Sequence, residues 1–157
     1  MVAVLGFCLF VPAPARTQPA FDAGDLAKYR LSLPVFTRFV HATRLLAARM
    51  REDPRYERDP LFSRDVSVAG DAAEMATALR NRLDSDPRLS AALFAADISA
   101  HEYATFALAL VAARLAYGFV EAGVLRRVPA GVAADNVSFV RVHLADVRTA
   151  LTQLGLE

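Results

Sequence analysis

The sequence predicts an all-α protein, a compact bundle of four or five helices with one long charged loop. Apolar residues recur at helical spacings of three and four along most of the chain, and helix-capping signals stand before several of these stretches. No alternation of apolar and polar residues with hairpin turn chemistry is found anywhere. With 157 residues, of which 55% are hydrophobic and 22% charged, the chain fits one globular domain.

The N-terminus is typical of an exported protein. Residues 2–11 form an apolar run, and Ala13 and Ala15 follow with the spacing that signal peptidase recognises. A helix of ten residues spans only about 15 Å, too little to cross a membrane. We therefore expect a signal-like segment (1–15), a linker (16–28), and a helical domain (29–157) in the periplasm.

Alternatives to cleavage and export remain at this stage. No positively charged residue precedes the apolar run, so the segment could instead be a buried part of a cytosolic protein. Lipidation of Cys8 is disfavoured because the bulky Phe7 precedes it. Cys8 is the only cysteine, so no disulfide can form within the mature chain.

Five helices are expected along the domain. Ser32 and Pro34 begin the first, which runs to about Arg51. The second follows Asp71, and the third follows Asp86-Pro87 and runs through the apolar residues Leu89, Leu93 and Phe94. The fourth begins at a capping box, Ser99 to Glu102, and spans about 100–122; it is apolar on nearly all sides, which favours a central core helix over a transmembrane one.

The fifth helix is expected over 133–154, after a turn at 129–131. Its apolar residues are spaced 3, 4, 3, 4 and 3 apart, which is a heptad seam typical of an antiparallel bundle helix. They are Val137, Val140, Leu144, Val147, Leu151 and Leu154.

The charged stretch 53–70 is the candidate interaction site. Two Asp-Pro pairs disfavour helix there, so a long surface loop is predicted, and loops of this length often carry function. Arginine and aromatic residues are enriched at protein interfaces. A loop that serves only as a solvated connector is the alternative. The expected partner-binding residues are Arg51, Arg55, Tyr56, Arg58, Leu61, Phe62 and Arg64.

Signals for catalysis, metals or cofactors are missing from the sequence. His41, His101 and His143 lack a second His or Cys ligand at helical spacing, and Glu102 is explained by its capping role. We expect no enzyme activity, no metal and no cofactor. A net charge of +1 and acidic residues interleaved among the arginines also disfavour nucleic acid as a partner.

The aromatic residues on helical faces are predicted to form the core. An apolar pocket between Phe36, Phe39, Phe106 and Phe139 is the alternative, and it would make the protein a periplasmic small-molecule binder.

Three sets of residues give the chain a resemblance to small exported all-helical proteins of unassigned function from Gemmatimonadota-type bacteria. They are Tyr29, Leu31, Ser32 and Pro34; Asp97, Ile98, Ser99, His101, Glu102 and Tyr103; and Pro129, Asn136, Val137, Phe139 and Val140. The resemblance implies an exported helical domain with no catalytic role. By analogy it extends to membrane-extrinsic accessory subunits of photosynthetic reaction-centre complexes.

The leading functional hypothesis combines these points. We expect a non-catalytic periplasmic interaction protein, an extrinsic subunit that docks on protein subunits of a larger membrane complex and is associated with the inner membrane through it. Direct membrane contact would be peripheral, through residues 1–15.

Overall fold

The computed structural model describes residues 28–58 and 72–153, and in this part of the chain it is all-helical, with six α-helices and no strand. The N-terminal segment 1–15 and residues 59–70 of the predicted loop lie outside the described residues. The elements are α2 (Leu33–Arg51), the 3-10 turn η1 (Pro54–Arg58), α3 (Ala72–Ser85), α4 (Pro87–Ala95), α5 (Ala100–Glu121), α6 (Ala134–Val142) and α7 (Leu144–Gln153).

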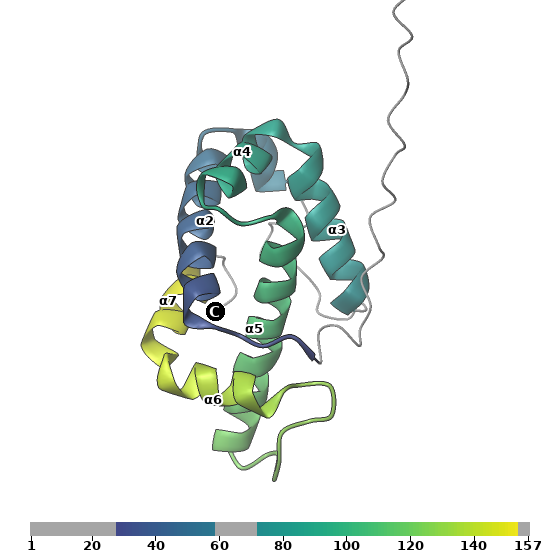
Figure 1. Ribbon diagram of the computed structural model, residues 1–157, viewed down its shortest axis with the longest axis vertical. Helices are drawn as coiled ribbons and strands as arrows, with labels where there is room; N and C mark the ends of the chain where they lie inside the picture. The colour runs from purple at the N-terminus through teal and green to yellow at the C-terminus, as the bar shows by residue number, and fades with distance from the viewer. Residues whose placement is uncertain (1–27, 59–71, 154–157) are drawn as a thin grey trace, which may run out of the picture.

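Helix α5 forms the centre of the bundle, as its composition predicted. Its N-terminus is capped by Ser99, whose Oγ accepts a hydrogen bond from the Glu102 N–H at 3.0 Å. Figure 1 shows α2 and α3 on opposite sides of α5, α4 across one end of the bundle, and α6 and α7 towards the other end. The helix therefore meets neighbours on several faces, which explains why apolar residues occur around its circumference.

Helix α5 is also the one helix in the described ranges that is long and apolar enough to cross a membrane, with a mean hydropathy of 1.6 over 18 residues. Half of that stretch is buried inside the protein. Core helices of globular bundles have the same length and composition, so this property agrees with the role that α5 has in the bundle.

Aromatic rings from α2 and α5 hold the core together. Phe39 stacks against Tyr103 with ring centroids 4.9 Å apart and lies 5.0 Å from the ring of Phe106. The Tyr103 hydroxyl is buried with these rings and shares a hydrogen bond of 3.1 Å with Thr43 Oγ1. The one polar atom of this aromatic layer is thus satisfied within the core, as burial requires.

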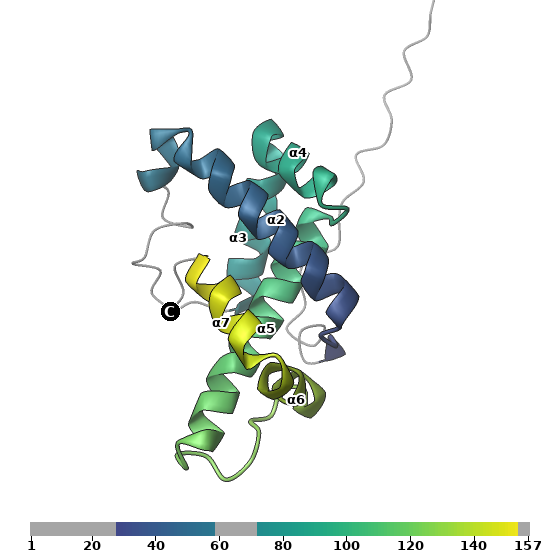
Figure 2. The ribbon, with the colours of Figure 1, turned by 90° about the vertical axis from the view of Figure 1, so that its left-hand side faces the viewer.

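The C-terminal helix differs from its prediction. The expected helix over 133–154 is divided at His143, whose φ of −109° and ψ of 28° end α6 before α7 begins. Helix α6 packs against α5, whereas α7 packs against α2, and Figure 2 shows the change of direction between them. The bend lets Val140 and Val147 both be fully buried although they belong to helices with different main neighbours. This division explains why six helices are found where at most five were predicted.

A buried asparagine joins the start of the domain to α6. The Asn136 side chain is 2% exposed, accepts a hydrogen bond from the Leu31 N–H and donates one to the Tyr29 carbonyl, each at 2.9 Å. Both backbone groups lie in an extended segment before α2 that has no helical partners of its own. Segments more than 100 residues apart in the sequence are thereby held together.

Candidate interaction surface

The predicted partner-binding residues are divided by the structure. Arg51 and Arg55 are exposed at the end of the bundle where α2 runs into η1, whereas Tyr56 is 2% exposed and belongs to the core. Arg58 ends η1, and its side chain is not among those described. Leu61, Phe62 and Arg64 lie outside the described residues.

The burial of Tyr56 contradicts the prediction that the whole stretch 53–70 is an exposed surface loop. Its hydroxyl donates a hydrogen bond of 2.6 Å to Asp86 Oδ2, and the Arg82 guanidinium lies 5.4 Å from the centre of its ring. Burial, followed by the hydrogen bond to Asp86, raises the pKa of the tyrosine. The aromatic ring thus fixes η1 against α3 and α4 and is not available to a partner.

Asp86 connects three parts of this end of the molecule. Its Oδ1 accepts from the Arg88 N–H at 3.0 Å, which caps α4 as the sequence predicted, and its Oδ2 accepts from Tyr56 and from Arg82 Nη1, the latter at 3.2 Å. The Tyr56 hydrogen bond is the largest of the effects that lower the pKa of the Asp86 carboxyl. A negative charge is therefore fixed at the N-terminus of α4, where the helix dipole favours it.

Asp53 orders two exposed arginines. Its Oδ2 lies 2.6 Å from Arg55 Nη2 and 3.4 Å from Arg88 Nη1, so both guanidinium groups converge on a carboxylate whose side chain is only 13% exposed. The Arg55 side-chain hydrogen bond, then the Arg55 backbone hydrogen bond, lower the pKa of Asp53 to about 2. The arginine side chains remain 74% and 62% exposed, so their outer edges are positioned but still open to solvent.

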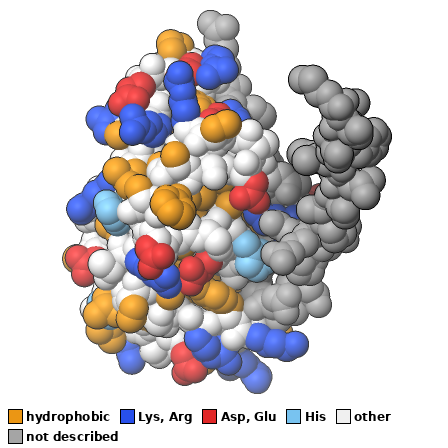
Figure 3. Space-filling model, turned by 45° about the horizontal axis from the view of Figure 1, so that its top comes forward, with side chains coloured by type: hydrophobic (Ala, Val, Ile, Leu, Met, Phe, Trp, Pro, Cys, Tyr) orange, Lys and Arg blue, Asp and Glu red, His pale blue; other side chains and the backbone are white. Residues whose placement is uncertain are grey.

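Helix α4 adds an exposed aromatic side chain to the same end. Phe94, expected among the apolar residues of this helix, is 87% exposed, while Leu89 and Leu93 are buried. We call Arg51, Arg55, Arg88 and Phe94 the α4-end surface. Figure 3 shows Lys and Arg side chains at the upper end of the molecule, with acidic and hydrophobic side chains among them, and further Lys and Arg side chains at its lower end.

The periodicity of the α4 sequence contains a signal for this surface. Along α4 and its C-cap residue, the buried residues Leu89, Ala92, Leu93 and Ala96 recur at steps of three, one and three. That periodicity defines a single inward face and leaves Phe94 about 100° away from Leu93, towards solvent. Arg88 lies next to Leu89 and is turned outward for the same reason.

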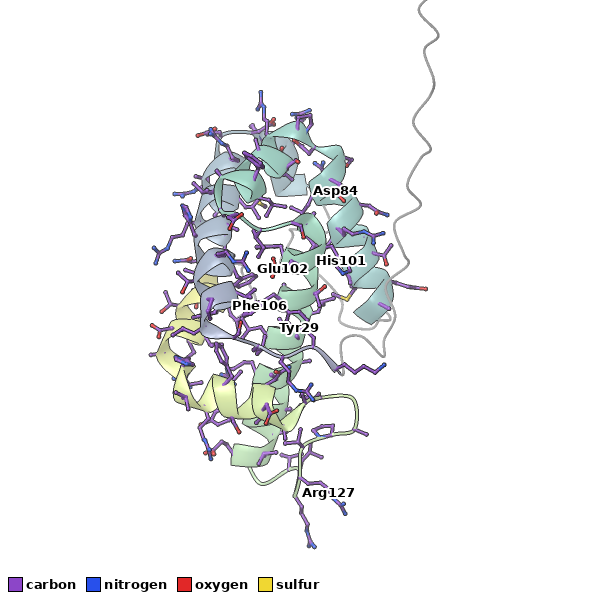
Figure 4. All side chains as sticks on the ribbon, in the orientation of Figure 1. Tyr29, Asp84, His101, Glu102, Phe106 and Arg127 are labelled. Carbon is purple, nitrogen blue, oxygen red and sulfur yellow. The ribbon has the colours of Figure 1, made fainter. Side chains whose placement is uncertain are left out.

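A second polar cluster lies between α2 and α5. Arg38 Nη2 donates to Glu102 Oε1 at 3.1 Å, and Arg38 Nη1 donates to the Asp97 carbonyl at 2.8 Å. Glu102 was expected to reach back to its own helix terminus; it binds the arginine of the neighbouring helix instead. Burial and the nearby Glu102 charge raise the pKa of Tyr29 to about 12, and Figure 4 shows Tyr29 and Glu102 near Phe106. These contacts join α2 to the α4–α5 corner.

The four phenylalanines considered as a pocket lining contact one another. Phe36 lies 6.1 Å from Phe106 and 5.7 Å from Phe139, measured between ring centroids, and Phe39 completes the group against Phe106. Their rings fill the space between α2, α5 and α6 as core residues do. This packing lends no support to the alternative of a small-molecule pocket.

Two further findings concern the site. Among residues 28–58 and 72–153, no group of three His, Cys, Asp or Glu side chains is placed to hold a metal ion. Comparison of the chain with protein-family models, with curated proteins and with solved structures gives no match.

Proposed function

We propose that this chain is a non-catalytic interaction protein, an exported periplasmic subunit that docks on a larger membrane complex through the α4-end surface. The observation that carries the proposal is Phe94, a large apolar side chain that is 87% exposed on α4, the helix whose first turn also carries the exposed Arg88. Arginine and aromatic side chains dominate the energetics of protein interfaces.

The physical advantage of this surface is that few of its side chains must lose conformational freedom when a partner binds. Full burial of a phenylalanine side chain contributes about 1.5–3 kcal/mol. Arg55 and Arg88 are already oriented by Asp53, so less side-chain entropy is lost when they meet a partner. The partner that complements this surface is a protein subunit with a patch of acidic and apolar side chains.

The polar groups of the domain support a binding role over a catalytic one. The hydrogen bonds of Tyr56, Asp86, Arg38 and Glu102 connect helices or cap them. The resemblance noted from the sequence extends the proposal to an extrinsic subunit of a photosynthetic reaction-centre complex in the periplasm. In that setting, residues 1–15 supply any peripheral membrane contact.

The test is affinity purification of the tagged full-length protein from membranes of the source cells in mild detergent. Intact mass and partner identification by mass spectrometry are the readouts. We expect stoichiometric membrane-protein partners with the wild type and their loss with Phe94→Ser or Arg88→Glu. Val142→Ser is the matched control, because Val142 is 72% exposed on α6 and lies outside the α4-end surface.

Three results would contradict the proposal. The wild-type protein could elute alone after mild extraction, or it could fractionate with cytosolic proteins. Alternatively, the partners could persist with Phe94→Ser while Val142→Ser releases them, which would place the docking site elsewhere.

A further inference from the structure

The connection between α5 and α6 has a composition that is uncommon for a surface loop. It comprises the twelve residues 122–133, which we call the α5–α6 loop. Its only polar side chains are those of Arg126 and Arg127, and every other residue in it is Ala, Gly, Val, Leu or Pro. Turns and loops are normally rich in Asn, Asp and Ser, whose side chains bind water and the loop backbone. This loop instead combines aliphatic side chains with positive charge.

The α5–α6 loop forms the tip of the molecule at the end opposite α4. Figures 1 and 2 show it extending beyond α6, and Figure 4 shows Arg127 pointing away from the bundle at this tip. Val124 is 68% exposed, and Arg126 and Arg127 are exposed beside it. An aliphatic side chain and two guanidinium groups are therefore presented together on a protruding part of the surface.

The first turn of the α5–α6 loop satisfies its own backbone donors. The N–H groups of residues 122–125 all donate to carbonyls in the last turn of α5, and those of Val124 and Leu125 share the Phe119 carbonyl, at 3.0 and 3.1 Å. Gly123 permits this tight turn because its φ is +70°, a conformation in which glycine is not strained. Val124 can therefore leave water without exposing an unpaired N–H, which is a large cost when backbone enters lipid.

The electrostatic balance at this end of the molecule is positive. In the part of the chain that the structure describes, neither Arg126 nor Arg127 forms an ion pair. The two carboxylates nearest in sequence are Glu121, exposed at the end of α5, and Asp135, in the first turn of α6. Asp135 Oδ2 lies 3.4 Å from Arg30 Nε, so its charge is already offset. Two exposed arginines thus stand against one carboxylate, and the loop complements an anionic surface.

We propose that the α5–α6 loop binds the surface of an anionic lipid bilayer. Val124 enters the boundary between the headgroups and the acyl chains, where apolar side chains of interfacial proteins are buried. Arg126 and Arg127 bind the lipid phosphates, because a guanidinium group can donate two parallel hydrogen bonds to one phosphate. The bilayer thus complements both the charge and the aliphatic side chains of the loop.

A protein partner fits the α5–α6 loop less well. The cores of protein interfaces are enriched in aromatic residues and are bordered by polar side chains that form hydrogen bonds across the contact. The loop has no aromatic residue, and the arginines are its only hydrogen-bonding side chains. Because the α4-end surface lies at the other end of the molecule, bilayer binding goes beyond the proposed docking function and does not depend on it. It adds a second membrane contact to the one proposed for residues 1–15.

The first test is co-sedimentation of the full-length chain with vesicles of phosphatidylglycerol mixed with phosphatidylcholine, compared with vesicles of phosphatidylcholine alone. An arginine near an anionic surface strengthens binding about fivefold, so Arg126→Gln combined with Arg127→Gln should weaken binding to the anionic vesicles about 25-fold. Arg44→Gln combined with Arg148→Gln is the matched control. It removes the same charge from exposed positions of α2 and α7 and should retain most of the affinity. Circular dichroism establishes that each variant is folded.

A tryptophan reporter tests whether the loop itself enters the bilayer. The chain contains no tryptophan, so Val124→Trp introduces a single emission. On binding to the phosphatidylglycerol vesicles, this emission should shift to shorter wavelength and be quenched by lipids with brominated acyl chains. Ser90→Trp is the control, because Ser90 is exposed on α4 at the opposite end of the molecule, and it should show neither change.

Four results would overturn the proposal. The chain could bind no vesicles, bind both kinds equally, or keep its affinity for the anionic vesicles when both arginines of the loop are replaced. Finally, the emission of Val124→Trp could remain unchanged in vesicle-bound protein, which would assign membrane contact to another part of the chain. Because these experiments contain lipid and no partner protein, their failure would leave docking through the α4-end surface unaffected.

Discussion

The hydroxyl of Tyr56 lies 2.6 Å from Asp86 Oδ2, and this single contact joins η1 to the corner between α3 and α4. The tyrosine comes from the stretch that the sequence marks as a charged loop, and the aspartate caps the next helix but one. Because the ring is buried, the arginines on either side of Tyr56 in the sequence are carried by an anchored segment. The buried Tyr56 therefore anchors the segment that carries Arg55, one of the exposed residues of the α4-end surface.

Removal of this hydroxyl should destabilise the fold. A hydrogen bond to a charged group contributes about 1.5–3 kcal/mol, so Tyr56→Phe should lower the free energy of unfolding by about that amount. Tyr56→Ala also removes the ring from the core and should cost about 3–5 kcal/mol. Urea denaturation followed by circular dichroism gives both values. Equal midpoints for Tyr56→Phe and the wild type would show that the contact does not stabilise the protein.

Stability should fall in acid because two carboxyl groups have lowered pKa values in the folded state. The pKa of Asp53 is about 2 against an ordinary value of 3.8, and that of Asp86 is also lowered. Each contributes stability that is fully present above the unfolded pKa of about 4 and is lost as the pH falls through its lowered folded pKa, which for Asp53 is about 2. Urea midpoints measured across this range should show the loss. Asp53→Asn should make the dependence shallower, whereas Asp84→Asn on the exposed side of α3 should retain the wild-type slope.

Local capping chemistry was predictable from the sequence at two helices, whereas Ser32 stands at the N-cap of α2 without a side-chain capping hydrogen bond. Ser99 and Asp86 cap their helices as expected, because an N-cap depends on groups only two or three residues away. Glu102 was predicted in part only. Its backbone N–H takes its place in the cap, but its side chain binds Arg38, which is 64 residues distant in sequence. A local sequence pattern therefore cannot predict that the Glu102 side chain pairs with Arg38.

Burial was less predictable for single aromatic residues. Tyr56 stands in a charged stretch and Phe94 in an apolar helix, yet the tyrosine is buried and the phenylalanine is exposed. The difference depends on where η1 and α4 are placed relative to the other helices. The division at His143 has a similar origin, since the heptad pattern of the last segment is continuous, but its two halves pack against different helices.

Asn136 should be essential for holding the start of the domain in place. Asn136→Leu removes both the acceptor for the Leu31 N–H and the donor to the Tyr29 carbonyl. Leaving the buried Leu31 N–H unsatisfied costs about 1–3 kcal/mol, whereas the part-buried Tyr29 carbonyl keeps Arg30 Nη1 at 3.4 Å, so we expect a loss of stability of about 1–3 kcal/mol. Hydrogen exchange at the Leu31 amide should accelerate more than exchange in α5. Ser138→Leu, an exposed position of α6, is the control. Unchanged protection of Leu31 would contradict the role.

The backbone at Asp97 should prefer glycine. Asp97 has a φ of +54°, and its side chain is 97% exposed, so its 3.7 Å contact with Arg38 contributes little. Glycine adopts this conformation without strain, whereas alanine lacks the local polar interactions that help aspartate do so. We expect Asp97→Gly to preserve or raise the melting temperature and Asp97→Ala to lower it. The opposite order would mean that the aspartate side chain matters more than its backbone conformation.

Stability should also fall in strong alkali, for reasons that lie in the aromatic core. Burial raises the pKa of Tyr103 to about 12, opposed in part by the hydrogen bond with Thr43, and the pKa of Tyr29 is also about 12. Both groups stay protonated in the folded protein above the ordinary pKa of 10. They contribute stability that is present below pH 10 and is lost as the pH rises from about 10 towards 12. As the pH is raised, the tyrosinate absorbance of Tyr29 and Tyr103 should therefore appear only above pH 10 and together with unfolding. Tyr103→Phe should cost about 1 kcal/mol at neutral pH through the Thr43 contact, yet it should flatten the alkaline decline. A decline as steep as that of the wild type would assign the alkaline sensitivity to other groups.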